Sequence, residues 1–335
     1  MTIKDLSALT GYSVGTVSRV LNDQPNVSEK ARKTIREAAE ACGFQLNTNA
    51  QQLKQQRSNN ILVLVKGSSN QFFGALVEAI QARVSEKTSY HLVVDYLDED
   101  SNEVLRALQL VREKKPLGIL FLGGNEENFR THFARIDTPC VLVTSDASDL
   151  TFPNLSSVCC DEFHATKSAI DRLIDMGHRQ IGIIGGFRER SDTATRRFQG
   201  CMAAFEEHKI PFAPDQDYAN ARFSHEGGYL AAEMLIARSD RYTAIFCMAD
   251  VMAMGAIRCL TDHGLKVPQD VSVIGFDGLS VGEYIVPRLT TVSQSVELLA
   301  QRSIDLLRQL FEEGATAAHE FIPAEIQWRE SARSI

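Results

Sequence analysis

Several kinds of signal are missing from this sequence of 335 residues. The seven cysteines are an odd number, and none has the spacing of metal ligands or of a CxxC redox pair. No apolar run approaches the roughly 20 residues of a membrane span, and the amphipathic N-terminus lacks the apolar segment of a secretory signal. These absences predict a reduced, cytoplasmic protein with no metal site and no membrane association.

The motifs of common enzymes are also missing. The segment GGFRER (185–190) is not GxGxxG, and no Walker motif follows an apolar strand-like run. HExxH, GxSxG and SxxK do not occur in a suitable context, and the eight histidines are scattered. The sequence therefore predicts a protein that is not an enzyme and holds no cofactor.

The charge is unevenly distributed. Hydrophobic residues make up 44% of the chain and charged residues 23%, which is ordinary for a soluble globular protein. Residues 1–58 hold eight Lys or Arg and five Asp or Glu, a net +3; because the whole chain carries −8, the remainder carries −11. A small basic head on a large acidic body indicates one nucleic-acid-binding face.

Residues 13–22, SVGTVSRVLN, have the features of the second helix of a helix-turn-helix. Ile3, Leu6 and Leu9 predict the apolar stripe of a short first helix. Gly11 suits a tight turn with positive φ, and Ser13 suits an N-cap. Two faces are then expected for the second helix: an inner face of Val17, Val20 and Leu21, and an outer face of Val14, Gly15, Ser18 and Arg19.

A third helix is expected after residue 27. Ser28 followed by Glu29 gives an N-cap and an acid in the first turn. Its apolar stripe is expected at Ile35, Ala38, Ala39 and Cys42, before Gly43. Three short helices by themselves leave open a small helical bundle with no nucleic-acid role.

The segment that follows carries a specific resemblance. The order TIKDLSALTGYSVGTVSRVLN, VSEKARKTIREAAEACGF and NTNAQQL resembles the DNA-binding headpiece and hinge of the lactose-repressor/galactose-repressor family of bacterial transcription regulators. The resemblance implies a DNA-binding domain at 1–58 with a hinge helix at 47–54, in which Leu53 is a wedge between base steps. The implied DNA-binding residues are Ser13, Val14, Gly15, Thr16, Ser18, Arg19, Asn22, Asn47, Asn49, Ala50, Gln51 and Leu53.

From residue 60 the pattern changes to alternating strands and helices. Continuous apolar runs such as ILVLV (61–65) and IGIIGG (181–186) are typical of buried parallel strands. About a dozen such strands are too many for one ordinary open sheet. The sequence therefore predicts an α/β fold with two doubly wound parallel-sheet lobes.

The resemblance continues through this region, in the motifs SNQFF, MGHRQIGIIGG, ATRRFQG, ADVMAMGA, VPQDVSVIGFD and PRLTTVSQ. It implies lobes of periplasmic-binding-protein type within an effector-binding and dimerisation domain at 59–335. The N-lobe is expected at about 60–160 and 292–322, and the C-lobe at about 161–291 and 323–335. A ligand is expected in the cleft between the lobes, at the carboxyl ends of the strands.

Six effector-binding residues are implied by the same motifs. Arg197 and Asp277 are the polar pair expected to hold ligand hydroxyls, and Phe72, Phe73 and Phe223 are expected to pack on the ligand's apolar face. Asp161 lies at the strand end that leads to the second lobe. For each Phe, the alternative to ligand contact is packing in the core. For Arg197, the alternative is an ion pair on the surface. Thr144 and Ala249 stand where many relatives have Asp and Asn, so each removes a hydrogen-bonding group from the implied pocket.

These features together predict a DNA-binding transcriptional regulator, a repressor, whose operator affinity is controlled by a small-molecule effector. The expected effector is a sugar or sugar derivative, and a purine or other metabolite is the alternative. The second hypothesis for the protein itself is a sugar-binding protein without a DNA role. One helix-turn-helix reads too few base pairs, so a homodimer on a palindromic operator is expected. The hinge is shorter than the roughly 12–15 residues of a marginally stable helix, so it is expected to fold only on DNA.

Overall fold

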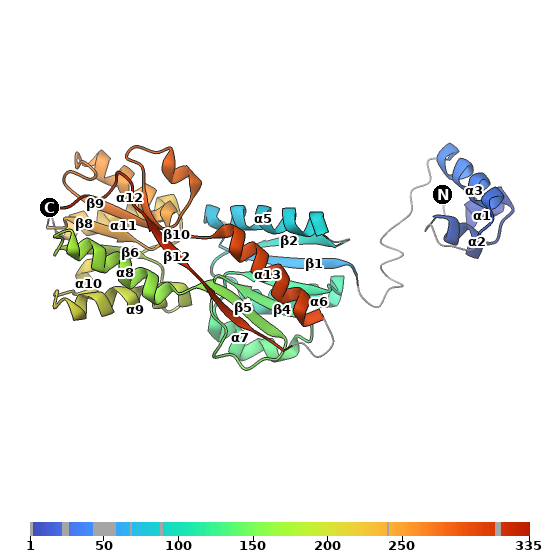
Figure 1. The fold of residues 1–335 in the computed structure, drawn as a ribbon, viewed down its shortest axis with the longest axis horizontal. Helices are drawn as coiled ribbons and strands as arrows, with labels where there is room; N and C mark the ends of the chain where they lie inside the picture. Colours follow the sequence, from blue (N-terminus) through green and yellow to red (C-terminus); the bar gives the residue numbers. More distant parts are fainter. Residues whose placement is uncertain are drawn as a thin grey trace. The chain divides into compact units, whose positions relative to one another are not determined.

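The computed structural model describes residues 3–21, 27–42, 58–67, 69–87, 90–239, 241–311 and 316–335 (Figure 1). The chain forms two compact units, residues 1–57 and 58–335. Asn22 and the predicted hinge helix 47–54, with Asn47, Asn49, Ala50, Gln51 and Leu53, lie outside the described residues.

Three helices form the described part of the first unit: α1 (Ile3–Thr10), α2 (Val14–Leu21) and α3 (Glu29–Ala41). Each packs on the other two around a core that contains Leu6, Val17, Val20 and Ile35. The prediction that Leu9 belongs to the buried stripe is wrong, because 60% of Leu9 is exposed. Leu6 lies in the core that α1 shares with α2 and α3, whereas Leu9 is not part of that core.

The predicted turn and caps of this unit are confirmed. Gly11 has a φ of +72°, the left-handed conformation that glycine adopts without a steric penalty. The Ser13 hydroxyl accepts a hydrogen bond from the Thr16 amide at 3.2 Å, and the Ser28 hydroxyl accepts one from the Ala31 amide at 3.4 Å. These bonds fix the first turns of α2 and α3 and therefore the direction in which α2 presents its outer face.

The first sheet of the second unit is entirely parallel, with the strand order β11-β5-β4-β3-β1-β2. Side chains that alternate along β1 enter different cores: Val63 packs on the side of α5 and α13, and Leu64 on the side of α6 and α7. The elements of this lobe are β1 (Asn60–Lys66), α5 (Gln71–Lys87), β2 (His91–Leu97), α6 (Glu103–Lys114), β3 (Gly118–Leu122), α7 (Glu126–His132), η1 (Phe133–Arg135), β4 (Cys140–Val143), β5 (Leu155–Cys160), α13 (Val296–Phe311) and β11 (His319–Ile322).

The second sheet has the order β12-β10-β9-β8-β6-β7, and only the edge strand β12 runs antiparallel to its neighbour. Helices α8 and α9 pack together on one face, and α11 and α12 pack together on the other. The elements of this lobe are α8 (Glu162–Asp175), β6 (Ile181–Gly185), α9 (Asp192–Glu207), α10 (Pro214–Asp217), β7 (Tyr218–Asn220), α11 (His225–Arg238), β8 (Ala244–Cys247), α12 (Asp250–Asp262), β9 (Ser272–Asp277), η2 (Ser280–Glu283), β10 (Thr290–Gln294) and β12 (Ala324–Gln327).

The chain passes between the two lobes three times. It crosses after β5, after β10 and between β11 and β12, and the last crossing is visible in Figure 1 as the red segment that joins the two sheets. The second crossing follows Gln294, a few residues beyond the boundary expected at about 291, because β10 pairs with β9 and β12 as part of the second sheet. The predicted fold class, a headpiece followed by two doubly wound α/β lobes, is confirmed.

Among the described residues, no helix combines the length and the apolar composition needed to cross a membrane.

Candidate functional site

A cavity of about 100 Å³ lies between the two lobes of the second unit, at the carboxyl ends of strands from both sheets. The first lobe contributes Lys66 at the end of β1 and Thr144 just after β4, and the second lobe contributes Asp277 and Gln294 at the ends of β9 and β10. Parallel strands all end at the same edge of their sheet, so polar side chains from distant parts of the chain converge there. This convergence makes the cavity the candidate ligand site.

Arg197 is the central cation of the cavity. It is only 3% exposed, although it projects from the amphipathic helix α9. Its Nη2 donates to Glu162 Oε1 at 2.8 Å, its Nη1 donates to the Met248 carbonyl, and its guanidinium lies 3.6 Å from the centroid of the Phe276 ring. The surface ion pair considered as an alternative for Arg197 is therefore not what the structure shows.

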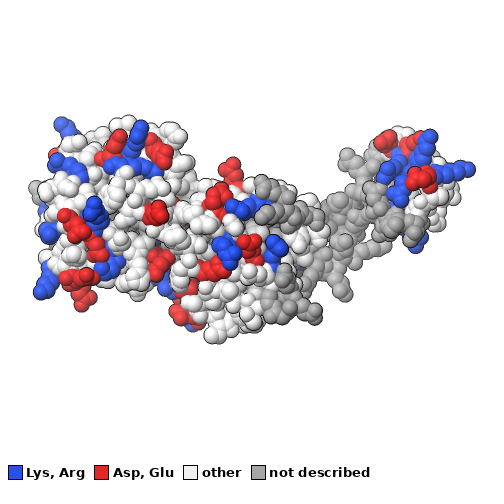
Figure 2. All heavy atoms as spheres, viewed as in Figure 1, with Lys and Arg blue, Asp and Glu red and all other residues white. Residues whose placement is uncertain are grey.

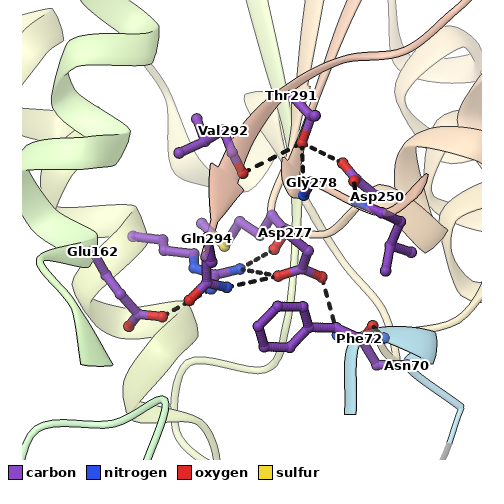
Figure 3. A network of polar contacts seen from close by, with 12 residues as sticks. Asn70, Phe72, Glu162, Asp250, Asp277, Gly278, Thr291, Val292 and Gln294 are labelled. Carbon is purple, nitrogen blue, oxygen red and sulfur yellow. Dashed lines mark hydrogen bonds and ion pairs between the residues drawn. The ribbon is translucent and has the colours of Figure 1, made fainter. Parts of the chain in front are cut away.

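Asp277 is the central carboxylate. Its Oδ1 lies 3.9 Å from Arg197 Nη1 and accepts a hydrogen bond from Gln294 Nε2 at 3.0 Å, and its Oδ2 accepts one from Asn70 Nδ2 at 3.2 Å (Figure 3). Asn70 belongs to the first lobe, so this last bond crosses the cleft. Burial raises the pKa of Asp277 to about 7, and the neighbouring Arg197 opposes this effect.

A second buried carboxylate supports the Asp277 turn from behind. Asp250, at the start of α12, accepts from the Leu279 amide at 2.7 Å and from Thr291 Oγ1 at 2.6 Å (Figure 3). These bonds hold the segment that follows Asp277, whose own φ of +125° is unusual for a residue with a side chain. Asp250 therefore positions the Asp277 carboxylate without lining the cavity.

All three predicted aromatic residues, Phe72, Phe73 and Phe223, line the cavity. Phe72 is also 2% exposed and part of the main core, so the alternative of core packing holds for it alongside the cavity wall. Phe73 and Phe223 are partly buried at the edge of the core. The aromatic groups add an apolar part to the lining of the cavity.

Asp161 does not line the cavity. It is the N-cap of α8, where its carboxylate accepts from the His164 amide at 3.1 Å and lies 2.7 Å from His164 Nδ1. The next residue, Glu162, is turned inward and is buried against Arg197. The prediction that Asp161 lines the ligand site is therefore wrong, and the next residue, Glu162, takes that place. Asp161 is the capping residue, so its carboxylate must face the free amides of its own helix.

Several polar residues of the cavity were not predicted from the sequence, among them Glu162, Asn70 and Gln294. Asn70 and Gln294 belong to the motifs SNQFF and PRLTTVSQ, so a signal for both was present in the sequence. Of the two departures from the family pattern, Thr144 lines the cavity, whereas Ala249 is the N-cap of α12 and is fully buried away from it. The N-cap at Ala249 has no side-chain hydrogen bond.

Charged side chains from the two lobes meet at the edge of the cleft. Arg222 of the second lobe lies 3.0 Å from Asp98 and 3.5 Å from Glu99 of the first, and Arg190 lies 3.0 Å from Asp100. Most of these groups are well exposed, so each pair contributes little to stability and is weakened by salt. They hold the lobes together in the arrangement described here.

The headpiece presents the predicted DNA-contacting face to solvent. Val14 is 42% exposed, Ser13, Gly15 and Arg19 are also exposed, and Thr16 and Ser18 are partly so. On the side shown in Figure 2, Lys and Arg side chains gather on the headpiece, whereas charges of both signs are interspersed over the larger unit. Small residues, hydroxyls and one Arg suit contacts to base edges and phosphates in a major groove.

Comparison with known proteins identifies both parts of the chain. Residues 2–47 match the model of bacterial regulatory proteins of the lacI family, and residues 170–332 match a periplasmic binding protein-like domain. The probable HTH-type transcriptional repressor ExuR of Bacillus subtilis (strain 168) is 32% identical over 342 residues, which cover 100% of this chain and 99% of the relative. The HTH-type transcriptional regulator MalR of Clostridium butyricum is 32% identical over 340 residues, which cover both chains completely.

Solved structures give the same result. The lac repressor dimer bound to operator and the anti-inducer ONPF matches with a TM-score of 0.84 and 26% identity over 99% of each chain. The transcriptional regulator CelR in complex with cellobiose matches in fold, with a TM-score of 0.72 and 24% identity over 99% of this chain. Because headpiece, lobes and whole-length relatives agree, the chain belongs to the lacI family of bacterial regulatory proteins and is a DNA-binding transcriptional regulator rather than an enzyme.

Proposed function

We propose that the protein is a cytoplasmic, homodimeric repressor of a palindromic operator, and that a sugar or sugar derivative in the cleft between the lobes controls its operator affinity. The observation that carries the proposal is the buried Arg197–Asp277 pair at the cleft, in a chain whose separate headpiece exposes a reading helix. A planar guanidinium and a carboxylate together suit the hydroxyls of a sugar ring. The lac repressor is a dimer bound to operator, which supports a homodimer on DNA. CelR forms a complex with cellobiose, which supports a sugar as the effector.

The site couples to DNA through the two lobes. Asn70 comes from one lobe and Arg197, Asp277 and Gln294 from the other, so a ligand between them favours one lobe arrangement. A coupling free energy of about 1–3 kcal/mol changes operator affinity about 5- to 150-fold. Effector and operator must influence each other's affinity by the same factor.

Two substitutions separate the two activities. Operator fragments are first recovered from the source genome by retention on the purified protein. Arg19→Ala removes an exposed cation of the reading helix, so it is expected to lose operator binding and to keep the effector-induced rise in melting temperature. Arg197→Ala is expected to keep operator binding and to lose the effector response.

Removal of Arg197 leaves Glu162 as a buried unpaired charge and destabilises the fold, so Phe223→Ala, on the aromatic wall, is the second cleft variant. Fluorescence anisotropy with labelled operator measures the first activity, and thermal shift measures the second. An effector response that survives both cleft substitutions would place the ligand elsewhere. Operator affinity unchanged by Arg19→Ala would overturn the proposed reading face.

A further inference from the structure

Most cations of the second unit are paired within the protein. Their side chains contact carboxylates, backbone carbonyls or aromatic rings: Arg106 lies 2.8 Å from Asp95, and Arg188 lies 4.1 Å from the centroid of the Phe198 ring. Seven cations of this unit have side chains that make no such contact with any other described residue: Arg112, Lys114, Lys115, Arg135, Lys209, Lys266 and Arg308. A cation without a partner can bind a group of opposite charge, so the location of these seven is informative.

Five of the seven lie at one edge of the first sheet. They belong to the ends of α6, η1 and α13, which lead into β3, β4 and β11, so they lie at the amino edge of the sheet (Figure 1). The cavity lies at the opposite, carboxyl edge. We call this exposed set the amino-edge patch, and its members are Arg112, Lys114, Lys115, Arg135 and Arg308. Among the described residues of these helix ends and the loops that follow them, the acids are Glu113 and Asp137, so cations predominate.

The tether to the headpiece is joined to the second unit at the same edge. Ser58, the first residue of this unit, is only 4% exposed. Its amide donates to the Lys115 carbonyl at 3.1 Å, and its hydroxyl donates to the Lys114 carbonyl at 3.0 Å. The last carbonyls of a helix have no partner within the helix, so Ser58 caps the end of α6. These bonds fix the start of the second unit directly beside the two lysines of the patch.

An operator held by the headpiece therefore lies near the patch. Leu53 is expected between base steps of the operator, and the five residues from there to Ser58 span at most about 18 Å. DNA phosphates are a dense array of negative charge, and lysine binds them as a point charge. The part of the chain after residue 58 carries −11, so most of it is repelled by DNA. A positive edge beside the tether places attraction where the second unit comes nearest to the duplex.

We propose that the amino-edge patch of each protomer contacts phosphates of the operator, with Lys114 and Lys115 as its principal contacts. The effector-binding unit then contributes its own, sequence-independent share to DNA affinity. The inference rests on the proposed function only in placing the headpiece and the tether on an operator. It adds a DNA-binding surface on the unit that holds the effector.

The patch is tested by removing charge at either end of the second unit. The patch variant carries Lys114→Gln and Lys115→Gln. The control carries Lys209→Gln and Lys266→Gln, which remove the same charge from the loops that follow α9 and α12, at the amino edge of the second sheet. Lys115 and Lys209 also share a left-handed backbone, with φ of +45° and +55°, so the two variants are matched in conformation. Fluorescence anisotropy measures affinity for the operator and for a random-sequence duplex between about 50 and 200 mM salt.

Each lost phosphate contact lowers the slope of log affinity against log salt by about 1. The patch variant removes two lysines from each protomer of a dimer, so its slope is expected to be smaller by about 2 to 4. Its affinity at about 100 mM salt is expected to fall at least about tenfold. The fall should be equal for operator and random duplex, because phosphates carry no sequence information. A wild-type slope in the patch variant, or an equal fall in the control, overturns the inference.

A neutral methylphosphonate at one operator phosphate at a time locates the contact. At a contacted phosphate, this change and the patch substitutions are each expected to weaken binding, and the two together no further. Additivity at every phosphate overturns direct contact. Arg112→Gln with Arg135→Gln is a second probe of the patch, in case the lysine variant does not fold, and it is expected to lower the slope as well. A wild type that binds no duplex overturns the proposed function, whereas a wild type that binds operator through a patch-independent slope overturns only this inference.

Discussion

Asp277 shows how strongly one residue depends on its surroundings. It is 2% exposed, and its backbone has a φ of +125°. Asn70 and Gln294 donate hydrogen bonds to its carboxylate, and Arg197 faces it. Asp250 supports the turn that follows it. Burial disfavours the charged carboxylate, whereas the donors and the guanidinium favour it. Because burial dominates, the pKa of Asp277 is raised to about 7.

This raised pKa predicts how stability depends on pH. Between about pH 4 and pH 7 the carboxyl is ionised in the unfolded chain and protonated in the folded protein. Asp277 therefore contributes stability below pH 4 that is lost as pH rises through about 7, by up to about 4 kcal/mol. Thermal unfolding of the wild type and of Asp277→Asn over this range is expected to show the wild type losing stability relative to the variant.

Asp250 remains in both proteins, and its charge also raises the pKa of Asp277, so the difference between them reports Asp277 together with this coupling. Burial raises the pKa of Asp250 to about 6, which affects the separate curves. A wild-type advantage that stays constant or grows from pH 4 to pH 7 would contradict the predicted direction.

The prediction from the sequence was Asp161, whereas the residue turned toward the cavity is its neighbour Glu162. Both are acids that follow strand β5 directly. In the structure Asp161 caps α8 and Glu162 pairs with Arg197, 35 residues further along the chain. Which carboxylate turns inward depends on where α9 places its guanidinium, and that is a tertiary contact.

At the scale of elements, helices α11 and α12 pack backbone against backbone. A Cβ added at Gly228 would lie 2.1 Å from the Met252 carbonyl oxygen, and one at Gly255 would lie 2.0 Å from the His225 carbonyl oxygen. Each glycine thus fits against the main chain of the other helix, which cannot move aside as a side chain could. The close contact lets both helices cover one face of the second sheet.

Gly228→Ala and Gly255→Ala are therefore expected to destabilise the protein by about 1–3 kcal/mol or more. Gly74→Ala in α5 is the control, because a Cβ there meets no atom within 4 Å. Glycine inside a helix is less stable than alanine, so this control is expected to stabilise by roughly 0.5–1 kcal/mol. Urea unfolding midpoints measure all three, and a wild-type midpoint for both packed variants would refute the close contact.

Strands β11 and β12 were the elements least visible in the sequence. Strands β1, β3 and β6 lie inside their sheets and are continuous apolar runs, which predicted them directly. Strands β11 and β12 lie at sheet edges and mix polar and apolar residues, and β12 is half exposed along its length. Such short segments become strands because a neighbouring strand offers hydrogen bonds, not because of their own pattern.

For the whole molecule, charge separates the two activities. Residues 1–58 carry +3 and the remainder −11, so salt is expected to act mainly on DNA binding. Counterion release makes operator affinity fall by on the order of 10³ between 50 and 200 mM salt if a dimer contacts at least about six phosphates. An uncharged effector releases no counterions, so its affinity is expected to change less than about threefold.

Fluorescence anisotropy measures how operator affinity depends on salt, and calorimetry measures the same for effector affinity in the same salt series. The exposed pairs of Arg222 and Arg190 at the cleft edge are screened over this range, which sets the small change expected for the effector. A flat operator response would exclude binding through the DNA backbone. An effector response as steep as the operator's would indicate a charged ligand.

The sequence by itself determined the class of the fold and most of its elements. The signals for these elements are local: the turn at Gly11, the cap at Ser13, the apolar runs of buried strands and the helical periodicities. Each depends on a few consecutive residues, so it can be recognised from the sequence alone. The tertiary structure decided that the second crossing follows β10, that Leu9 is exposed and that Gln294 and Glu162 belong to the cavity. Burial and hydrogen bonding of these residues depend on groups that folding brings from distant segments, and no local pattern specifies them.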